Sequence, residues 1–331
     1  MTASCKKTVY LYIALITTLG IGLIFSVYLG SSSIGFTGFL KGLFLKNGFN
    51  TESVIIYNLR LPRALGAIVA GMGLAVSGAI LQTVTNNGLA GPNIIGVNAG
   101  AGLGIVLISV FLPFNFYLTP FAAFLGALLT TLLIAFVASK SGGQKSTIIL
   151  AGIAFTAILN AFISLFMLLD DDLPINYRYF SIGGLYGVNL EKIIIPFFIV
   201  LLAILISILF SNKIDALHLN DTTAISVGVN VKRVRYVAVI VASLSAAAAV
   251  SFAGLLGFVG LAVPHIARKL VGVKTSRLVP VSALLGANLL VFADLLSRVI
   301  LPKTEIPLGI ITAFLGAPFF VILLIRRNYN A

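Results

Sequence analysis

The sequence predicts an all-α integral membrane protein with about ten transmembrane helices, arranged as two opposed five-helix halves. Of its 331 residues, 59% are hydrophobic and only 9% are charged, and the mean hydropathy is +1.12. A soluble domain carries about 25% charged residues, so the composition excludes that class. Long apolar runs recur along the chain, as expected of helices that cross a bilayer.

Ten apolar segments are predicted to span the membrane. The first follows Lys6 and Lys7 and could be a signal peptide, but it is longer than a typical signal core and no small-x-small cleavage site follows it. The segment 257–271 is rich in glycine and short of a full crossing, so we expect a broken or tilted helix there. The predicted spans are 8–29, 61–83, 94–112, 118–138, 147–169, 190–210, 236–255, 257–271, 279–299 and 306–325.

The placement of charges predicts that both termini lie in the cytoplasm. Lys and Arg are enriched in the cytoplasmic loops of membrane proteins. With this orientation, 14 of the 22 cations fall inside and the acidic stretch 170–172 falls outside. Arg60 and Arg63, on either side of Pro62, fall outside against the trend. The cytoplasmic cations are Lys6, Lys7, Lys140, Lys145, Lys213, Lys232, Arg233, Arg235, Arg268, Lys269, Lys274, Arg277, Arg326 and Arg327.

Two pairs of segments indicate an internal repeat. "PFAAFLGALL" (120–129) aligns without gaps with "PVSALLGANL" (280–289), and "FTAILNAF" (155–162) aligns less well with "ITAFLGAP" (311–318). Because each half holds an odd number of helices, paired helices run in opposite directions, as in many transporters. We therefore expect one domain over 1–331, with halves at about 1–169 and 190–325. The alternative is chance similarity between helices rich in Gly, Ala and Leu.

The sequence contains no recognisable enzyme chemistry. Its two histidines, His218 and His265, lack metal-ligand spacing, and we interpret His265 as a structural residue at a helix end. No G-x-x-x-x-G-K-[ST] motif occurs, since "SGGQKST" (141–147) lacks the spacing, so no P-loop ATPase site is expected in this chain. We expect no metal or cofactor here. The net charge of +13 is scattered between apolar runs and not interleaved with aromatic residues, which argues against a nucleic-acid partner.

Ionisable residues within the predicted spans are scarce. Asp294 is the only acidic residue in the interior of one, since Glu191 stands at the start of its span, and Arg298 follows Asp294 by one helical turn, a spacing that brings the two side chains together. An ion-coupled transporter usually carries more buried ionisable residues.

The polar segment 211–235 is too polar to span and too long for a hairpin. Within it, "LNDTTAISVGV" predicts a short helix capped by Asn220 or Asp221 and ended by Gly228. A cytoplasmic helix in a chain without its own ATPase site suggests a contact for a separate ATPase. The alternative is an amphipathic segment that rests on the membrane.

Five blocks of sequence, in order, resemble the FecCD permease family, the permease subunits of ABC importers for iron–siderophores, haem and vitamin B12. The blocks are "RLPRALGAIVAGMGLAVSGAILQ" with "NNGLAGPNIIGVNAGAGLG", "LNDTTAISVGV", "GLLGFVGLAVPHIARKLVG", "LLGANLLVFADLLSR" and "EIPLGIITAFLGAPFF". The resemblance covers nearly the whole chain. It implies ten helices in two opposed halves, with the fifth and tenth spans lining the pathway.

The resemblance also implies roles for individual residues. Arg60, Arg63 and Arg298 would form an outward-facing cationic surface that receives carboxylates of a substrate-binding protein; the alternative is that they only anchor helix ends. Contact with the ATPase would fall to Asn220, Asp221, Ala224, Gly228 and Val229. Other positions in the blocks are expected to be structural: Gln82, Asn87, Leu89, Ala90, Pro92, Gly96, Pro264, His265, Arg268, Asp294, Glu305 and Pro307.

The chain departs from the family pattern at several positions. Gly88 stands where proline is usual, and Asn220 and Thr222 stand where Gly and Glu are more usual. The outer segment 176–187 lacks the usual tryptophan, a role that we expect Phe180 to take. These departures indicate a divergent member, so its substrate is not presumed from the blocks alone.

Together these features predict a permease subunit of an ABC importer in the cytoplasmic membrane that carries an iron chelate, with a ferric siderophore favoured. The expected partners are a second permease, identical or paralogous, two cytoplasmic ATPase subunits that bind ATP and Mg²⁺, and an extracytoplasmic substrate-binding protein. The alternatives are a haem or vitamin B12 permease of the same family, an ion-coupled secondary transporter, and a purely structural membrane subunit.

Overall fold

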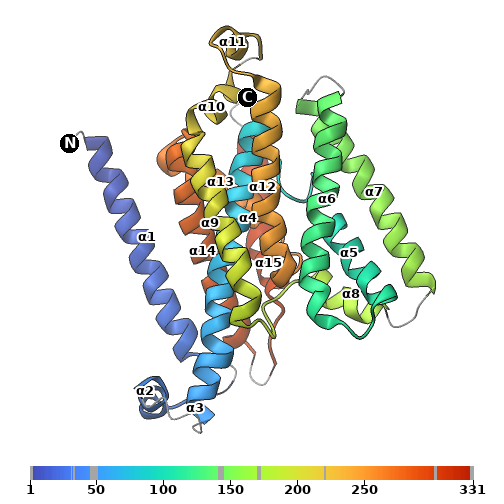
Figure 1. The fold of residues 1–331 in the computed structure, drawn as a ribbon. Coiled ribbons are helices and arrows are strands. Elements are labelled where there is room, and N and C mark those ends of the chain that lie inside the picture. The colour runs from blue at the N-terminus through green and yellow to red at the C-terminus, as the bar shows by residue number, and fades with distance from the viewer. Residues whose placement is uncertain are drawn as a thin grey trace.

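The computed structural model describes residues 3–30, 32, 34–44, 51–140, 145–169, 173–219, 221–301 and 304–328. Within these ranges the chain is helical and contains no strand (Figure 1). The expectation of an all-α membrane protein is confirmed. The inverted relation of the two halves stays a prediction.

Ten helices occupy the positions of the ten predicted spans. Seven helical stretches are long and apolar enough to cross a bilayer, and two more are apolar but shorter. The remaining helix has 13 residues, about 20 Å at 1.5 Å per residue, so it falls short of a crossing as the sequence predicted. The ten are α1 (Ala3–Tyr28), α4 (Leu61–Thr85), α5 (Val97–Phe111), α6 (Thr119–Lys140), α7 (Lys145–Leu169), α9 (Leu190–Leu209), α12 (Val231–Ala253), α13 (Val259–Val271), α14 (Thr275–Val299) and α15 (Leu308–Asn328).

In the described connections between these helices there are eight short elements. They are α2 (Phe36–Phe44), α3 (Thr51–Val54), η1 (Ile55–Arg60), η2 (Phe116–Leu118), α8 (Leu173–Ile182), α10 (Ser211–Asp215), η3 (Ala216–His218) and α11 (Asp221–Ser226). The sequence analysis predicted only the last of these. Helical backbone continues from α3 through η1 into α4, so Arg60 stands within a helical run and not in a loop ahead of it.

Helix α4 stands at the centre of the bundle and contacts α9, α12, α13 and α14 (Figure 1). Helix α1 packs on the outside, mainly against α14. Helices α5, α6 and α7 form a second group with α8, and this group joins the first through α6 and α12.

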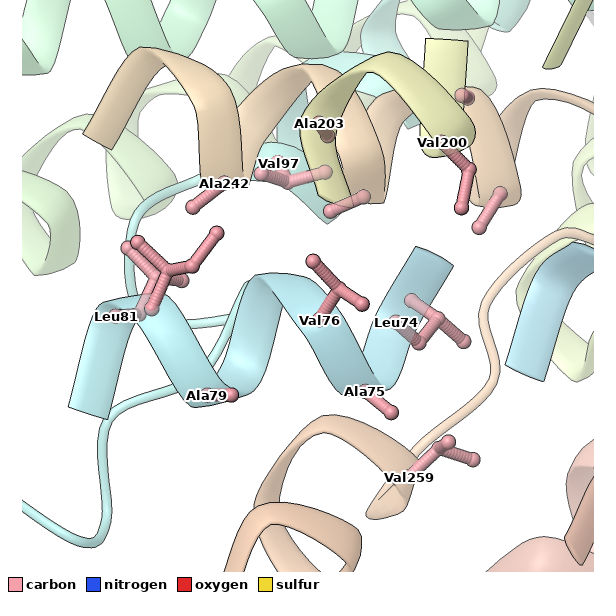
Figure 2. Packing of buried hydrophobic residues seen from close by; sticks show 14 of the residues in the cluster. Leu74, Ala75, Val76, Ala79, Leu81, Val97, Val200, Ala203, Ala242 and Val259 are labelled. Carbon is pink, nitrogen blue, oxygen red and sulfur yellow. The ribbon is translucent and has the colours of Figure 1, made fainter. Parts of the chain in front are cut away.

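Small residues let the neighbours of α4 approach its backbone. A Cβ added at Gly71 would collide with the carbonyl of Gly286 in α14, and one at Gly78 would collide with the carbonyl of Gly260 in α13. Membrane helices associate through such close contacts, because lipid tails provide no hydrophobic force that would drive helices together. Figure 2 shows the larger residues between these contacts, with Val76 of α4 pointing towards α9.

The bundle has two distinct ends. Helices α10 and α11 lie at one end, towards which both termini also point, and α2 and α3 lie at the other (Figure 1). We refer to them as the α11 end and the α2 end. The predicted docking arginines lie at the α2 end, and the predicted ATPase contact lies at the α11 end.

Candidate functional site

At the α2 end, Arg60 and Arg298 bind the last turn of α1, and Arg63 joins Arg298 through a shared carboxylate. Arg60 lies in η1, and its Nη1 donates hydrogen bonds to the carbonyls of Val27 (3.0 Å) and Tyr28. Its Nη2 donates to the carbonyl of Ser32. The carbonyls in the last turn of a helix have no partner within the helix. Arg60 therefore caps α1.

Arg298, in the last turn of α14, caps the same helix from the other side. Its Nη1 donates to the carbonyls of Ser26 (3.0 Å) and Leu29 (3.3 Å), and its Nη2 donates to the Ser26 hydroxyl (2.6 Å). The Nη2 also lies 3.1 Å from a carboxylate oxygen of Asp294, one helical turn earlier. The predicted pairing of Asp294 with Arg298 is confirmed.

Arg63 joins α4 to α14 and to the loop before α15. Its Nε donates to Asp294 (2.7 Å), and its Nη1 donates to Glu305 (2.5 Å). Asp294 is fully buried and is shared between Arg63 and Arg298. The loop is held further by a hydrogen bond from the Ile306 amide to the Ser297 carbonyl (2.9 Å). Pro307 follows and precedes the first residue of α15.

The arginines do not form the exposed cationic surface that the family resemblance implied. Arg60 is 5% exposed and Arg298 is 3% exposed, because both guanidinium groups point inward to cap α1. The side chains of Arg63 and Glu305 are more accessible, with exposed fractions of 12% and 27%. The guanidinium groups of Arg63 and Arg298 share the carboxylates of Asp294 and Glu305, whereas Arg60 donates its hydrogen bonds to backbone carbonyls and to Ser32. A docking role for these residues stays a prediction.

At the α11 end, the predicted short helix is present. Helix α11 begins at Asp221 and ends at Ser226, and Gly228 follows with φ +82°. The amide of Val229 donates to the carbonyl of Ala224 (3.1 Å), which closes the turn. A left-handed glycine after a helix is a common C-terminal stop, so the predicted role of Gly228 is confirmed. Asn220, the other predicted cap, lies outside the described residues.

Two contacts fasten this segment to the bundle. Asp221 forms an ion pair with Arg235 in the first turns of α12 (2.8 Å), and Ala224 is buried against the bundle. Ile225 and Val227 remain exposed. Helix α11 thus exposes Ile225 among polar residues, and Val227 follows it, while the two contacts hold the helix against the bundle.

Neighbouring residues connect the segment to the ends of α14 and α7. Asp215 accepts hydrogen bonds from the amide and hydroxyl of Thr275, and so caps the first turn of α14. Lys145 donates to the carbonyl of Leu217 (3.2 Å). Burial, reinforced by Arg268 and Lys145, lowers the pKa of His218, which keeps its imidazole neutral at physiological pH.

Motif residues from the first and third sequence blocks meet at the centre of the α11 end. Gln82, buried in α4, accepts a hydrogen bond from Arg268 (2.5 Å) and donates to the carbonyl of Leu261 (3.2 Å). Arg268 and Gln82 thereby link α13 to α4. Pro92 is also buried and packs beside Gly260.

The turn after α4 is closed despite the glycine at position 88. The Asn87 side chain accepts from the amide of Leu89 (2.9 Å), and its carbonyl accepts from the amide of Ala90 (3.1 Å). Gly96 precedes α5 with φ +73° and is packed against Thr130. The side chain and the carbonyl of Asn87 thus hold this turn without a proline at position 88.

Three other residues singled out in the sequence, Phe180, Pro264 and His265, pack against neighbouring segments of the bundle. Phe180 is buried, and its carbonyl accepts from the amide of Leu255 (3.0 Å). His265 lies in the middle of α13, next to the buried Pro264 and edge-on to Phe319 of α15, so its expected place at a helix end was wrong. Across the described ranges, no group of three or more His, Cys, Asp or Glu side chains could hold a metal ion.

The contacts that join distant blocks were not predicted from the sequence. Arg63 and Glu305 are separated by 242 residues, and Gln82 and Arg268 by 186. One available signal was chemical, because a polar or charged side chain inside an apolar helix needs a partner. This rule identifies which residues need a partner, but it does not identify which partner each residue has.

This helical bundle, with seven stretches long and apolar enough to cross a membrane and with polar links buried at both ends, defines a multi-pass membrane protein. The FecCD transport family model matches residues 18–326, and the chain belongs to this family of ABC importer permeases.

Individual relatives agree with this membership. The Fe(3+)-citrate import system permease protein YfmD of Bacillus subtilis is 37% identical over 99% of this chain and 97% of its own length. The vitamin B12 import system permease protein BtuC of Vibrio cholerae is 37% identical over 84% of each chain. Among solved structures, a metal-chelate type ABC transporter in an inward-facing conformation superposes with a TM-score of 0.83, at 29% identity over 95% of this chain and 98% of that one.

We expect Asp294→Asn to destabilise the chain strongly, because it leaves Arg63 and Arg298 buried with less charge compensation. Breaking a buried ion pair costs about 3–5 kcal/mol. Thermal unfolding of the purified chain in detergent measures the loss. The matched control is Asp221→Asn, which removes a half-exposed carboxylate from an arginine at the other end and is expected to cost less. Equal losses would contradict a special role for the Asp294 network.

Proposed function

We propose that this chain is the permease subunit of an importer that carries an iron chelate, with a ferric siderophore favoured, across the cytoplasmic membrane. The observation that carries the proposal is the similarity over nearly the full length to a permease named for Fe(3+)-citrate import. The substrate crosses without chemical change, so the chain needs no catalytic residues.

A haem or vitamin B12 permease remains the second candidate, because BtuC is as similar in sequence as YfmD over the part that it covers. An ion-coupled carrier is less well supported. The fully buried carboxylate of Asp294 is bound by two arginines and holds α4 and α14 together, so it already has a structural role.

The α11 end would face the cytoplasm, with both termini, and the α2 end would face outward. This assignment follows the charge bias of the sequence. Two cytoplasmic ATPase subunits would contact the α11 end and bind ATP and Mg²⁺. A substrate-binding protein would dock at the α2 end. A second permease, identical or paralogous, would complete the pathway, which α7 and α15 would line.

Docking on the α2 end would involve an exchange of carboxylates. Arg63 is the most accessible of the three arginines, and it already holds Glu305 from the loop before α15. A carboxylate of the binding protein could replace Glu305 on the same guanidinium group. Arg60 and Arg298 would support the site by fixing the end of α1, without contacting the partner.

At the other end, α11 would sit in a groove of the ATPase. Its exposed apolar residues supply the contact, and the Asp221–Arg235 pair and the buried Ala224 transmit its movement to the bundle. The Asp215 cap on Thr275 links the same region to α14, which reaches the arginine network at the α2 end.

The substrate class can be tested by growth. A strain that lacks the gene, with and without a plasmid copy, is grown on single iron sources that represent citrate, hydroxamate and catecholate chelates, on haem, and on cobalamin in a cobalamin-requiring background. We expect the plasmid copy to restore growth on one ferric chelate. Restoration only on haem or only on cobalamin would overturn the preferred substrate class and support the second candidate.

The docking proposal predicts opposite effects for two substitutions. Arg63→Gln should weaken binding of the loaded substrate-binding protein by roughly tenfold or more, since a hydrogen bond to a charged group contributes about 1.5–3 kcal/mol. Glu305→Gln should strengthen binding, because it removes the competing carboxylate. Surface-immobilised complexes in nanodiscs give both affinities. Arg178→Gln, an exposed cation in α8 outside the network, is the control. Indistinguishable effects of Arg63→Gln and Arg178→Gln would refute the docking site.

The coupling proposal predicts that Gly228→Val lowers substrate uptake severalfold while ATP hydrolysis by the complex continues. A bulky residue at this position disturbs the turn that supports α11. Uptake and hydrolysis are measured in the same proteoliposomes. Gly272→Val is matched, because Gly272 also ends a helix at φ +80° with open space around its Cα. It lies outside the proposed ATPase contact, so an equal loss of coupling there would contradict the role of the 228 turn.

A further inference from the structure

A cavity of about 440 Å³ opens at the α11 end between the last turn of α9, α10 and the first turns of α12. Ile80 of α4 also lines it, and the turn at 228–230 borders it. Its volume lies within the range of about 300–1,000 Å³ that is common for small-molecule sites. None of the roles proposed above uses this cavity.

The cavity combines an apolar interior with a cationic rim. Ile206 and Val241 are among the aliphatic residues inside it, whereas Lys213 and Arg233 stand at its edge and are exposed. No acidic residue lines it. Within the part of the chain that the structure describes, neither cation forms an ion pair. The Lys213 ammonium lies 5.4 Å from the ring centre of Phe210.

The surroundings place this cavity at the edge of the bilayer. Leu205 and Leu209 of α9 are 53% and 71% exposed, so this face of the helix meets lipid tails in a membrane. Lys213 and Arg233 stand just beyond that apolar surface, at the depth of the headgroups. If Lys213 and Arg233 served only to set the orientation of the protein in the membrane, no cavity would be needed beside them.

We propose that this cavity binds an anionic phospholipid. One acyl chain would enter the apolar interior, and the phosphate would lie between Lys213 and Arg233. Basic pockets between transmembrane helices bind anionic headgroups, and each cation near the surface strengthens that binding. A zwitterionic lipid would place its own positive group against two cations that lack a counter-charge, so an anionic headgroup is favoured.

The bound lipid would also touch the segment that we propose contacts the ATPase. Gly228 and Val229 line the cavity together with Asn230, whose side chain accepts a hydrogen bond from the Arg233 amide (3.1 Å). The lipid would brace the turn that supports α11. This consequence rests on the proposed function, whereas lipid binding itself does not.

Native mass spectrometry of the full chain, exchanged into mild detergent with phosphatidylglycerol or phosphatidylcholine, tests the proposal. We expect phosphatidylglycerol to bind preferentially, and the double variant Lys213→Gln, Arg233→Gln to lose on the order of tenfold in affinity for it. Val237→Phe, at the exposed rim of the cavity, should also weaken binding although every charge remains. Neither result depends on ATP or on uptake, so failure of the proposed function would leave both unchanged.

The matched control is Lys232→Gln with Lys274→Gln, which removes two exposed cations at the same end that do not line the cavity. This variant should keep its preference for phosphatidylglycerol. An equal loss in the control would overturn the proposal in favour of general surface charge. Equal binding of phosphatidylcholine would overturn it, as would full competition by soluble glycerol phosphate, which would indicate an anion site without an acyl chain. A cross-link from position 237 to a protein partner instead of lipid would also overturn it.

Discussion

The structure depends on how closely the neighbours of α4 approach its backbone. The carbonyls of Gly286 and Gly260 occupy the space that side chains would need at Gly71 and Gly78, and the Ser245 hydroxyl donates to the carbonyl of Gly73 (2.9 Å). Because these contacts join backbone to backbone, α4, α13 and α14 cannot shift independently by more than a small distance. The polar links at both ends are built on this fixed set of helices.

The two ends of the bundle use their charges differently. At the α2 end, the guanidinium groups are buried and bind carbonyls and shared carboxylates. Each group is therefore held in position by several contacts. At the α11 end, Arg235 is buried in one ion pair while Lys213 and Arg233 remain at the surface. Helix α14 connects the two environments, since Thr275 at its start is capped by Asp215 and Arg298 at its end caps α1. A movement of α10 and a change in the arginine network therefore act on the same rigid element.

Much of the fold could be predicted from the sequence, because ten apolar runs correspond directly to ten helices. The Asp294–Arg298 pair and the Gly228 stop were also predictable, since both depend on spacing within one helix or turn. The environment of the arginines was not. Burial of Arg60 depends on where the end of α1 lies, and that position is set by packing between segments that are distant in sequence. The family pattern implied a free surface at these arginines, where this chain has an internally bonded network.

Helix α1 is largely exposed along its length, yet its last turn is held by residues from α3–α4 and α14. A ribosome that makes this chain delivers the end of α14 about 270 residues after the end of α1. Until then, α1 must remain in the bilayer as an independent hydrophobic span with its terminal carbonyls uncapped by Arg298. The attachment of α1 to the bundle therefore depends on a helix that is made long after it, because α14 supplies both its main packing surface and the Arg298 cap.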